Sequence, residues 1–190
     1  PEKLEAAIKA HPDAKAVAFV HAETSTGVRS DAKTLCRIAK DAGMLVIVDA
    51  VTSLAGIELK ADEWGADVIY SGTQKCLSGL PGISPITFSD AAVEVIRART
   101  QKVQSWFLDM NLIMGYWGEG AKRSYHHTAP VNAVYAIHEA LLMLEEEGLE
   151  ASVARHKANH LKLAAGLSEL GLELAVAEDW RLPQLNSVLI

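Results

Sequence analysis

The chain has 190 residues and a formal net charge of −6, with 49% hydrophobic and 22% charged residues. This composition is typical of a soluble globular protein with a sizeable core, and no Lys/Arg cluster indicates a nucleic-acid partner. No apolar run approaches the ~20 residues of a membrane-spanning helix and no signal peptide opens the chain, so we expect no membrane partner and a cytoplasmic location.

Helix and strand patterns alternate along the first fifty residues. Residues 2–10 place their apolar positions on one helical face, and residues 15–23 form a continuous apolar run that predicts a strand buried on both faces. A polar turn at 24–30 leads into a second helix at 31–43, and a second buried strand follows at 44–50. This alternation predicts an α/β fold with a mostly parallel sheet and helices on both of its faces.

The helix at 31–43 carries recognisable signals at both ends. Ser30 or Asp31 can cap its first turn, and Gly43 is suited to its C-terminal end. One apolar stripe runs along it, formed by Leu35, Ile38, Ala39 and Ala42.

The remaining patterns divide the chain into two units. Strands are expected at 66–71, 84–90, 172–177 and 186–190, helices at 89–100, 130–148 and 149–171, and a short helix with a loop at 107–120. Residues around 62–65 are expected to be irregular. We expect a large domain over 1–147 and the start of a small α+β domain over 148–190, with Gly148 between the two long helices.

The ends of the chain indicate an internal piece of a longer protein. The chain opens on Pro1 rather than on Met, and residues 185–190 have the pattern of a strand without a following turn. We therefore expect part of a functional site to lie outside the chain. The compartment of the full-length protein and the activity of this piece alone stay open.

Asp49 stands directly after the apolar strand at 44–48, so its carboxylate should be partly buried. A buried carboxylate is costly without a partner. One explanation is a local turn in which the carboxylate binds the backbone two residues later. The other is an anion that faces a cationic or protonated group of a ligand.

Lys75 stands in a loop of small residues after the strand at 66–71. Taken alone, it is best explained as a solvated surface lysine. Because ligands of open α/β sheets bind beyond the carboxyl ends of the strands, Asp49 and Lys75 should meet at one edge. A lysine amine and an acid facing one ring are what pyridoxal 5'-phosphate requires, for its aldehyde and its pyridine nitrogen. Val51 could then lie on the ring face, although core packing explains it almost equally well.

Four segments together carry a resemblance to a known family. These are "HAETSTGV" (21–28), "VIVDAVTSLAG" (46–56), "YSGTQKCLSGLPG" (70–82) and "YHHTAP" (125–130). In this order they resemble the signature segments of the class V aminotransferases of fold type I, and within them the alanine–glyoxylate and serine–pyruvate aminotransferases. The resemblance implies the large domain of a fold type I pyridoxal-phosphate transferase and a two-fold homodimer with shared active sites.

The resemblance also implies roles for individual residues. Lys75 would hold the cofactor as a Schiff base, the internal aldimine, and move the substrate's α-proton. Asp49 would pair with the pyridine nitrogen, and Val51 would pack on the ring. Thr24 would bind near the phenolic oxygen of the ring, and Gln74 would contact the phosphate.

Tyr125 and Thr128 would reach the phosphate of the neighbouring subunit, if the resemblance holds. Without it, the segment that contains His126 and His127 is explained as a solvated loop. A metal site is the weaker alternative, because two adjacent histidines without further ligands bind a metal poorly.

Neither cysteine is expected to act in catalysis. Cys36 and Cys76 form no disulfide framework and no metal-ligand spacing. Cys76 stands beside Lys75 but receives no role. Cys36 lies in a helix, whereas a cysteine desulfurase needs its reactive cysteine on a mobile loop.

The implied reaction is transamination from alanine or serine to glyoxylate or another 2-oxo acid. Two alternatives stay open. One is another class V transaminase, with 2-aminoethylphosphonate or a purine-derived amine as donor. The other is a catalytically incomplete piece that acts only as a dimerising scaffold, because the family's phosphate-binding turn and carboxylate-binding arginine fall outside residues 1–190.

Overall fold

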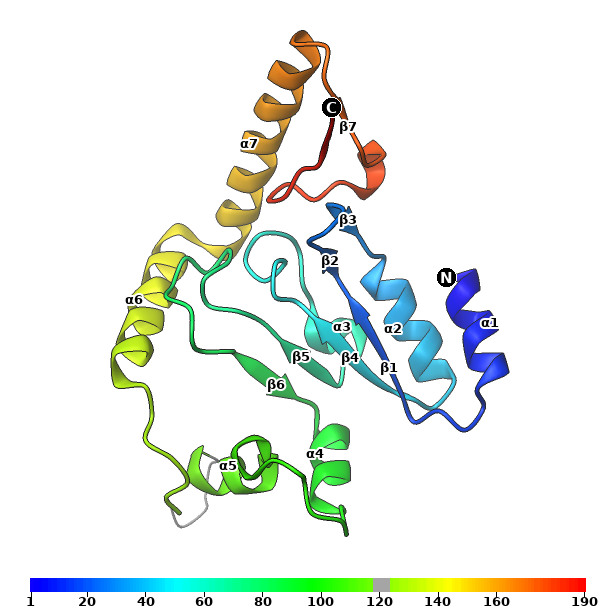
Figure 1. The fold of residues 1–190 in the computed structure, drawn as a ribbon, viewed down its shortest axis with the longest axis vertical. Coiled ribbons are helices and arrows are strands. Elements are labelled where there is room, and N and C mark those ends of the chain that lie inside the picture. Colours follow the sequence, from blue (N-terminus) through cyan, green and yellow to red (C-terminus); the bar gives the residue numbers. More distant parts are fainter. Residues whose placement is uncertain (118–123) are drawn as a thin grey trace.

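The computed structural model describes residues 1–117 and 124–190. Its main sheet has the strand order β1-β4-β5-β6 (Figure 1). Strands β1 (Ala16–Val20), β4 (Leu45–Asp49) and β5 (Val68–Tyr70) are parallel, and β6 (Ile86–Phe88) pairs antiparallel with β5. The sheet is therefore mostly parallel, as the alternating patterns predict.

One face of this sheet is covered by α2 (Ala32–Asp41) and α3 (Ala61–Trp64), and α1 (Glu2–Ala10) packs on α2. Successive side chains of a strand point to opposite faces, so Val46 and Val48 of β4 both face α2. The core around them consists of Ala32, Cys36, Ala39, Val46, Val48, Ala50, Trp64 and Ile69.

Both ends of α2 agree with the signals in its sequence. Asp31, one of the two expected caps of α2, accepts a hydrogen bond from the Thr34 N–H at 3.1 Å. Gly43 has φ +74°, which is the left-handed conformation that glycine adopts without strain. Ala42, which was expected in the apolar stripe, is exposed. Cys36, which was not, is fully buried in the core.

Several local expectations are wrong. Residues 15–23 are not one strand buried on both faces, because β1 ends at Val20, lies at an edge of the sheet and is half exposed. The polar residues 24–30 are more than a turn, because they include β3 (Val28–Arg29), which residues 24–27 join to β2 (Ala22–Glu23) in an antiparallel hairpin. Residues 61–64 are helical, where the sequence suggests an irregular segment.

The second half of the described chain is mostly helical. Its elements are α4 (Asp90–Arg97), η1 (Trp106–Leu108), α5 (Met110–Trp117), α6 (Val131–Glu147), α7 (Leu149–Glu169), η2 (Glu178–Trp180), and the antiparallel pair β7 (Glu173–Leu174) and β8 (Val188–Leu189). The loop expected at the end of 107–120 falls partly outside the described residues. Within the described ranges, no helix is long and apolar enough to cross a membrane.

The C-terminal segment returns to the first half of the chain. Leu182 is fully buried in a small cluster with Ala22 and Ile57, against which Leu185 packs. The Leu182 N–H donates to the Gly27 carbonyl at 3.2 Å. These contacts place residues 182–185 beside the hairpin that follows β1 (Figure 1).

Asp67, just before β5, is a buried charge that the sequence does not single out. It is 3% exposed and accepts hydrogen bonds from the Lys40 amine at 2.9 and 3.0 Å, from the Ser89 hydroxyl at 2.8 Å and from the Val46 N–H at 2.8 Å. Burial disfavours its charged form, but the bonds from Lys40, Ser89 and Val46 outweigh that effect and hold its pKa below the ordinary value. Asp67 thus ties α2, β4 and the cap of α4 to one point.

Replacing Asp67 by Ala is expected to lower the free energy of unfolding by about 2–4 kcal/mol, because three donors lose their acceptor inside the fold. Urea denaturation measures this loss, and Asp13→Ala, at an exposed aspartate, is the matched control. A loss as small as that of the control would show that Asp67 is not a structural anchor.

Candidate active site

The carboxyl ends of three parallel strands lie side by side. Val20, Asp49 and Tyr70, the last residues of β1, β4 and β5, are in register across the sheet. The hydrogen bonds continue past the strands, from the His21 N–H to the Asp49 carbonyl and from the Ala50 N–H to the Tyr70 carbonyl, both at 2.9 Å. The polar segments after these strands therefore share one edge, as expected.

Asp49 is held by two donors at this edge. Its Oδ1 accepts from the Val51 N–H and its Oδ2 from the Tyr70 hydroxyl, both at 2.9 Å. The first bond is the local turn that the sequence offered as one explanation, whereas the second fixes the carboxylate from a neighbouring strand. The hydrogen bond to Asp49, with burial, raises the pKa of Tyr70 above its ordinary value. Both bonds leave the carboxylate in one orientation.

His21 lies next to Asp49, but its imidazole is not a cationic partner for the Asp49 carboxylate. It is 3% exposed, and its Nδ1 has no hydrogen-bond partner among the described residues. Burial, aided by the positive charge of Arg29, lowers the pKa of His21 to about 4. The imidazole is therefore neutral at ordinary pH.

The Lys75 loop, residues 71–84, is built around Thr73, which is fully buried. Its hydroxyl is within hydrogen-bond reach of the Leu80 and Ile83 carbonyls, and its own carbonyl accepts from the Gly79 N–H at 2.8 Å. A Cβ at Gly79 would lie 3.2 Å from that carbonyl oxygen, so the tight turn needs glycine there. The Ser71 hydroxyl donates to the Ala50 carbonyl at 2.9 Å and ties the loop to the end of β4.

Lys75 itself is exposed on this fixed loop. Its amine forms no hydrogen bond or ion pair with any residue that the structure describes. It borders a cavity of about 440 Å³. The lining residues are Thr24, Thr52, Gln74, Lys75, Cys76, Ser78, His156, Gln184 and Leu185.

Three of the seven expected site residues thus line one cavity. Thr24, Gln74 and Lys75 do so, whereas Asp49 and Val51, among the described residues, stand outside its lining. Gln74 is seated close to Gly72, because a Cβ on that glycine would lie 2.9 Å from its Oε1. The structure thus brings the segment with Thr24 and the segment with Gln74 and Lys75 to one cavity. Asp49 lies at the end of β4, beside β5.

Thr52 connects the segments around the cavity and was missed by the sequence analysis. Its hydroxyl donates to the Ala22 carbonyl at 2.9 Å and lies 3.5 Å from the Thr24 hydroxyl. Its carbonyl accepts from the Gln184 amide at 2.7 Å, and the Cys76 thiol is 3.7 Å away. These partners come from distant parts of the chain, so no local pattern could reveal them.

Tyr125 and Thr128 lie elsewhere. The Tyr125 hydroxyl is 2.8 Å from the Thr128 hydroxyl, and in the described part of the chain neither residue borders the Lys75 cavity. The segment that carries them, between α5 and α6, is at the opposite end of the molecule from α7 (Figure 1). It is not a fully solvated loop, because His126 is 5% exposed and stacks on Trp106 with ring centroids 4.0 Å apart.

Both thiols are in environments that disfavour the thiolate. Burial, with the charge of Asp67, raises the pKa of Cys36 to about 11. Burial also raises the pKa of Cys76. Thiolates are the reactive form of cysteine, so both environments lower the reactivity of these thiols.

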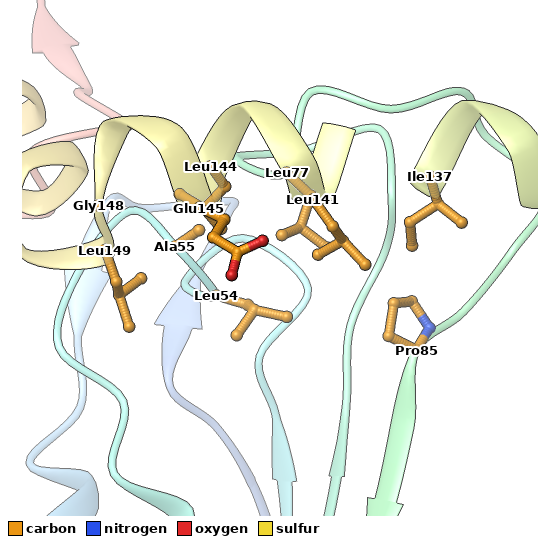
Figure 2. A pocket seen from close by; sticks show the side chains of 10 residues that line it. All are labelled: Leu54, Ala55, Leu77, Pro85, Ile137, Leu141, Leu144, Glu145, Gly148 and Leu149. Atoms are coloured by element: carbon orange, nitrogen blue, oxygen red, sulfur yellow. The ribbon is translucent and has the colours of Figure 1, made fainter. Parts of the chain in front are cut away.

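A second hollow, of about 480 Å³, lies behind the Lys75 loop. Figure 2 shows apolar side chains of α6, among them Ile137 and Leu141, facing Leu77 of the loop and Pro85 just after it, with Leu54 nearby. Its lining is apolar apart from Glu145. A phosphate or a carboxylate finds no cationic partner among these lining residues, so the Lys75 cavity is the better candidate for the active site.

The chain matches the family Aminotransferase class-V over residues 1–188 and therefore belongs to it. It is 41% identical over 174 residues to the alanine–glyoxylate aminotransferase of Oryctolagus cuniculus, which covers 90% of this chain and 44% of that protein. It is 35% identical over 192 residues to the (S)-ureidoglycine–glyoxylate transaminase of Bacillus subtilis, with 92% and 46% covered. The crystal structure of alanine–glyoxylate aminotransferase from Nostoc sp. matches with a TM-score of 0.95 at 44% identity, covering 100% of this chain and 49% of that one.

These matches confirm the expected fold type I architecture and the class V family. They also show that the chain spans about half the length of the relatives that it resembles. The family depends on pyridoxal phosphate.

The residues present fit that cofactor. The Lys75 amine has no partner among described residues, which leaves it available beside a cavity. The amide of Gln74 and the hydroxyls of Thr24 and Ser78 supply hydrogen-bonding groups at the same cavity. Asp49, held at the end of β4 by the Val51 N–H and the Tyr70 hydroxyl, is an acidic side chain of the kind that a protonated pyridine nitrogen would require.

Proposed function

We propose that the protein containing this chain is a pyridoxal-phosphate transaminase that moves the amino group of alanine or serine to glyoxylate or another 2-oxo acid. The observation that carries the proposal is that two groups belong to the same edge of the sheet: the Lys75 amine, which has no partner among the described residues, and the Asp49 carboxylate, which two hydrogen bonds hold in place. The alanine–glyoxylate aminotransferases among the relatives support the substrate class.

In this proposal each residue acts on the cofactor or the substrate in a stated way. Lys75 holds the cofactor's aldehyde carbon through its amine and later carries the proton of the substrate's α-carbon. Asp49 keeps the ring nitrogen protonated, and Val51 packs on the ring. Thr24 donates near the phenolic oxygen, and Gln74 contacts the phosphate. Bound pyridoxal phosphate supplies the electron sink for the bonds at the α-carbon.

A second candidate donor is a purine-derived amine. It is favoured by the 35% identity to the (S)-ureidoglycine–glyoxylate transaminase of Bacillus subtilis. Both candidates share the acceptor that the two relatives' names print, so only the donor separates them. A panel of amino donors with glyoxylate as the common acceptor distinguishes alanine and serine from such an amine.

Borohydride reduction tests the attachment of the cofactor directly. The protein mixed with pyridoxal phosphate is expected to be yellow and to lose its visible absorption on reduction. The reduced cofactor should then stay attached, as a label, to the peptide that contains Lys75. Lys157→Ala, at an exposed lysine of α7, is the control and should label like the parent. Labelling spread over several lysines, or none on Lys75, would refute the proposed site.

We further propose a homodimer in which Tyr125 and Thr128 contact the phosphate in the partner subunit. Two features support it: the pair lies away from its own Lys75 cavity, and α6 exposes apolar side chains such as Val134, Tyr135 and Leu142. Sedimentation velocity tests the dimer, and a monomer at micromolar concentration would contradict it.

The division into a large domain (1–147) and a small domain (148–190) is a proposal as well. It is supported by Gly148, whose φ of +86° allows the chain to turn between α6 and α7. Limited proteolysis tests it, because cleavage confined to the region around Gly148 is expected only at a domain boundary.

A further inference from the structure

The Lys75 cavity is closed on one side by residues that come from the end of the chain. Gln184 and Leu185 line it together with His156 of α7. Gln184 reaches the segment that follows β4, since its Nε2 donates to the Thr52 carbonyl at 2.7 Å across 132 residues of sequence.

The amide of Gln184 is fitted tightly against Gly56. A Cβ at Gly56 would lie 3.3 Å from the Gln184 Cδ and 2.7 Å from the Cys76 Sγ, so any side chain there would displace both neighbours. The glycine therefore lets the carboxamide lie against the backbone of the loop after β4. This close packing fixes the orientation of the Gln184 amide and thus of its hydrogen bond to the Thr52 carbonyl.

The other polar atom of this amide, Oε1, is evidence against a purely structural role for Gln184. Gln184 Oε1 is buried and accepts no hydrogen bond from any described residue. A buried acceptor without a donor destabilises the folded state, so an apolar side chain of the same length would hold this position about as well. The benefit of a carboxamide here is the fixed donor to Thr52.

Thr52, whose carbonyl Gln184 holds, lies next to residues that we expect around the cofactor. Its hydroxyl lies 3.5 Å from that of Thr24, and it directly follows Val51, whose N–H holds the Asp49 carboxylate. We propose that Gln184 is a positioning residue for the cofactor: by fixing the Thr52 carbonyl, it orients Thr24 and Val51 around the ring. This inference rests on the proposed function.

The test compares Gln184→Met with the parent protein, both purified without cofactor. Methionine has a similar length and removes the donor together with the orphan acceptor, so the free energy of unfolding should stay close to the parent's. The Kd for pyridoxal phosphate, from titration of the visible absorption, should rise about three- to tenfold, the effect of one net hydrogen bond. The matched control is Asn186→Met, because the Asn186 amide donates only within its own turn, to the Pro183 carbonyl at 3.5 Å, and its Kd should not change.

The outcomes separate the inference from the function on which it rests. A parent that binds pyridoxal phosphate while Gln184→Met binds it equally tightly overturns the inference alone. A variant that loses stability and keeps its Kd shows a structural role and overturns it as well. A parent that binds no pyridoxal phosphate overturns the proposed function and this inference together.

Discussion

Replacing Lys75 by Ala is expected to lower transaminase turnover by at least ~10³-fold, because the variant loses both the covalent attachment point and the acid–base group at the α-carbon. The size of the loss follows from the geometry. No other lysine lines the cavity among the described residues, so no neighbouring amine can take over either task. Turnover with an alanine and glyoxylate pair, in the protein saturated with pyridoxal phosphate, measures the effect.

A second variant separates the chemistry of the lysine from its charge. Lys75→Arg keeps the positive charge, but a guanidinium stays protonated in proteins and cannot hold an aldehyde carbon in this way. Its turnover should therefore fall as far as that of Lys75→Ala, while Lys162→Ala, at an exposed lysine of α7, should stay at the parental rate. Parental activity in either Lys75 variant would assign the chemistry to another residue.

The sequence predicted the parts of this site that depend on local pattern. Asp49 was found because it directly follows a run of apolar residues and its carboxylate should be partly buried, and Lys75 because its loop follows the next strand. The expectation that both belong to one edge followed from the rule that parallel strands end together, and the register of β1, β4 and β5 shows that these strands do end at one edge. The alternation of helices and strands was sufficient for the fold class.

The residues that the sequence missed depend on contacts between distant segments. Tyr70 donates to Asp49 only because β4 and β5 pair with these two residues opposite each other. Knowledge of that register would have been enough to predict Tyr70 as a partner of Asp49. Thr52 and Gln184 meet across 132 residues, and nothing in either local sequence indicates the other.

The errors in the strands have a physical cause too. A continuous apolar run predicts burial on both faces, yet β1 pairs with only one neighbour among the described residues and remains half exposed. The hairpin at 22–29 was missed because its strands have two residues each, which is too short for a periodic pattern. Its apolar partner, Leu182, comes from the far end of the chain.

Asp49→Asn is expected to keep the cofactor bound but to lower turnover by about 10²- to 10⁴-fold, a range typical of losing an essential ionisable group. The substitution preserves size, and the asparagine oxygen can still accept from the Tyr70 hydroxyl or the Val51 N–H. What it removes is the negative charge that favours a protonated ring nitrogen. The loss should therefore appear in turnover, while borohydride labelling of Lys75 persists.

Tyr70 provides an independent measure that the substitution has acted where we expect. The Asp49 hydrogen bond raises the pKa of Tyr70 in the parent, so that pKa should fall toward its ordinary value in Asp49→Asn. Near-ultraviolet absorbance during a pH titration follows this change, and Tyr70→Phe identifies the signal. Tyr70→Phe also keeps the charge of Asp49 and removes only one of its two donors, so its turnover should fall far less. If Asp49→Asn lowers the pKa of Tyr70 and leaves turnover near the parental rate, the carboxylate is a structural turn and not the partner of the ring nitrogen.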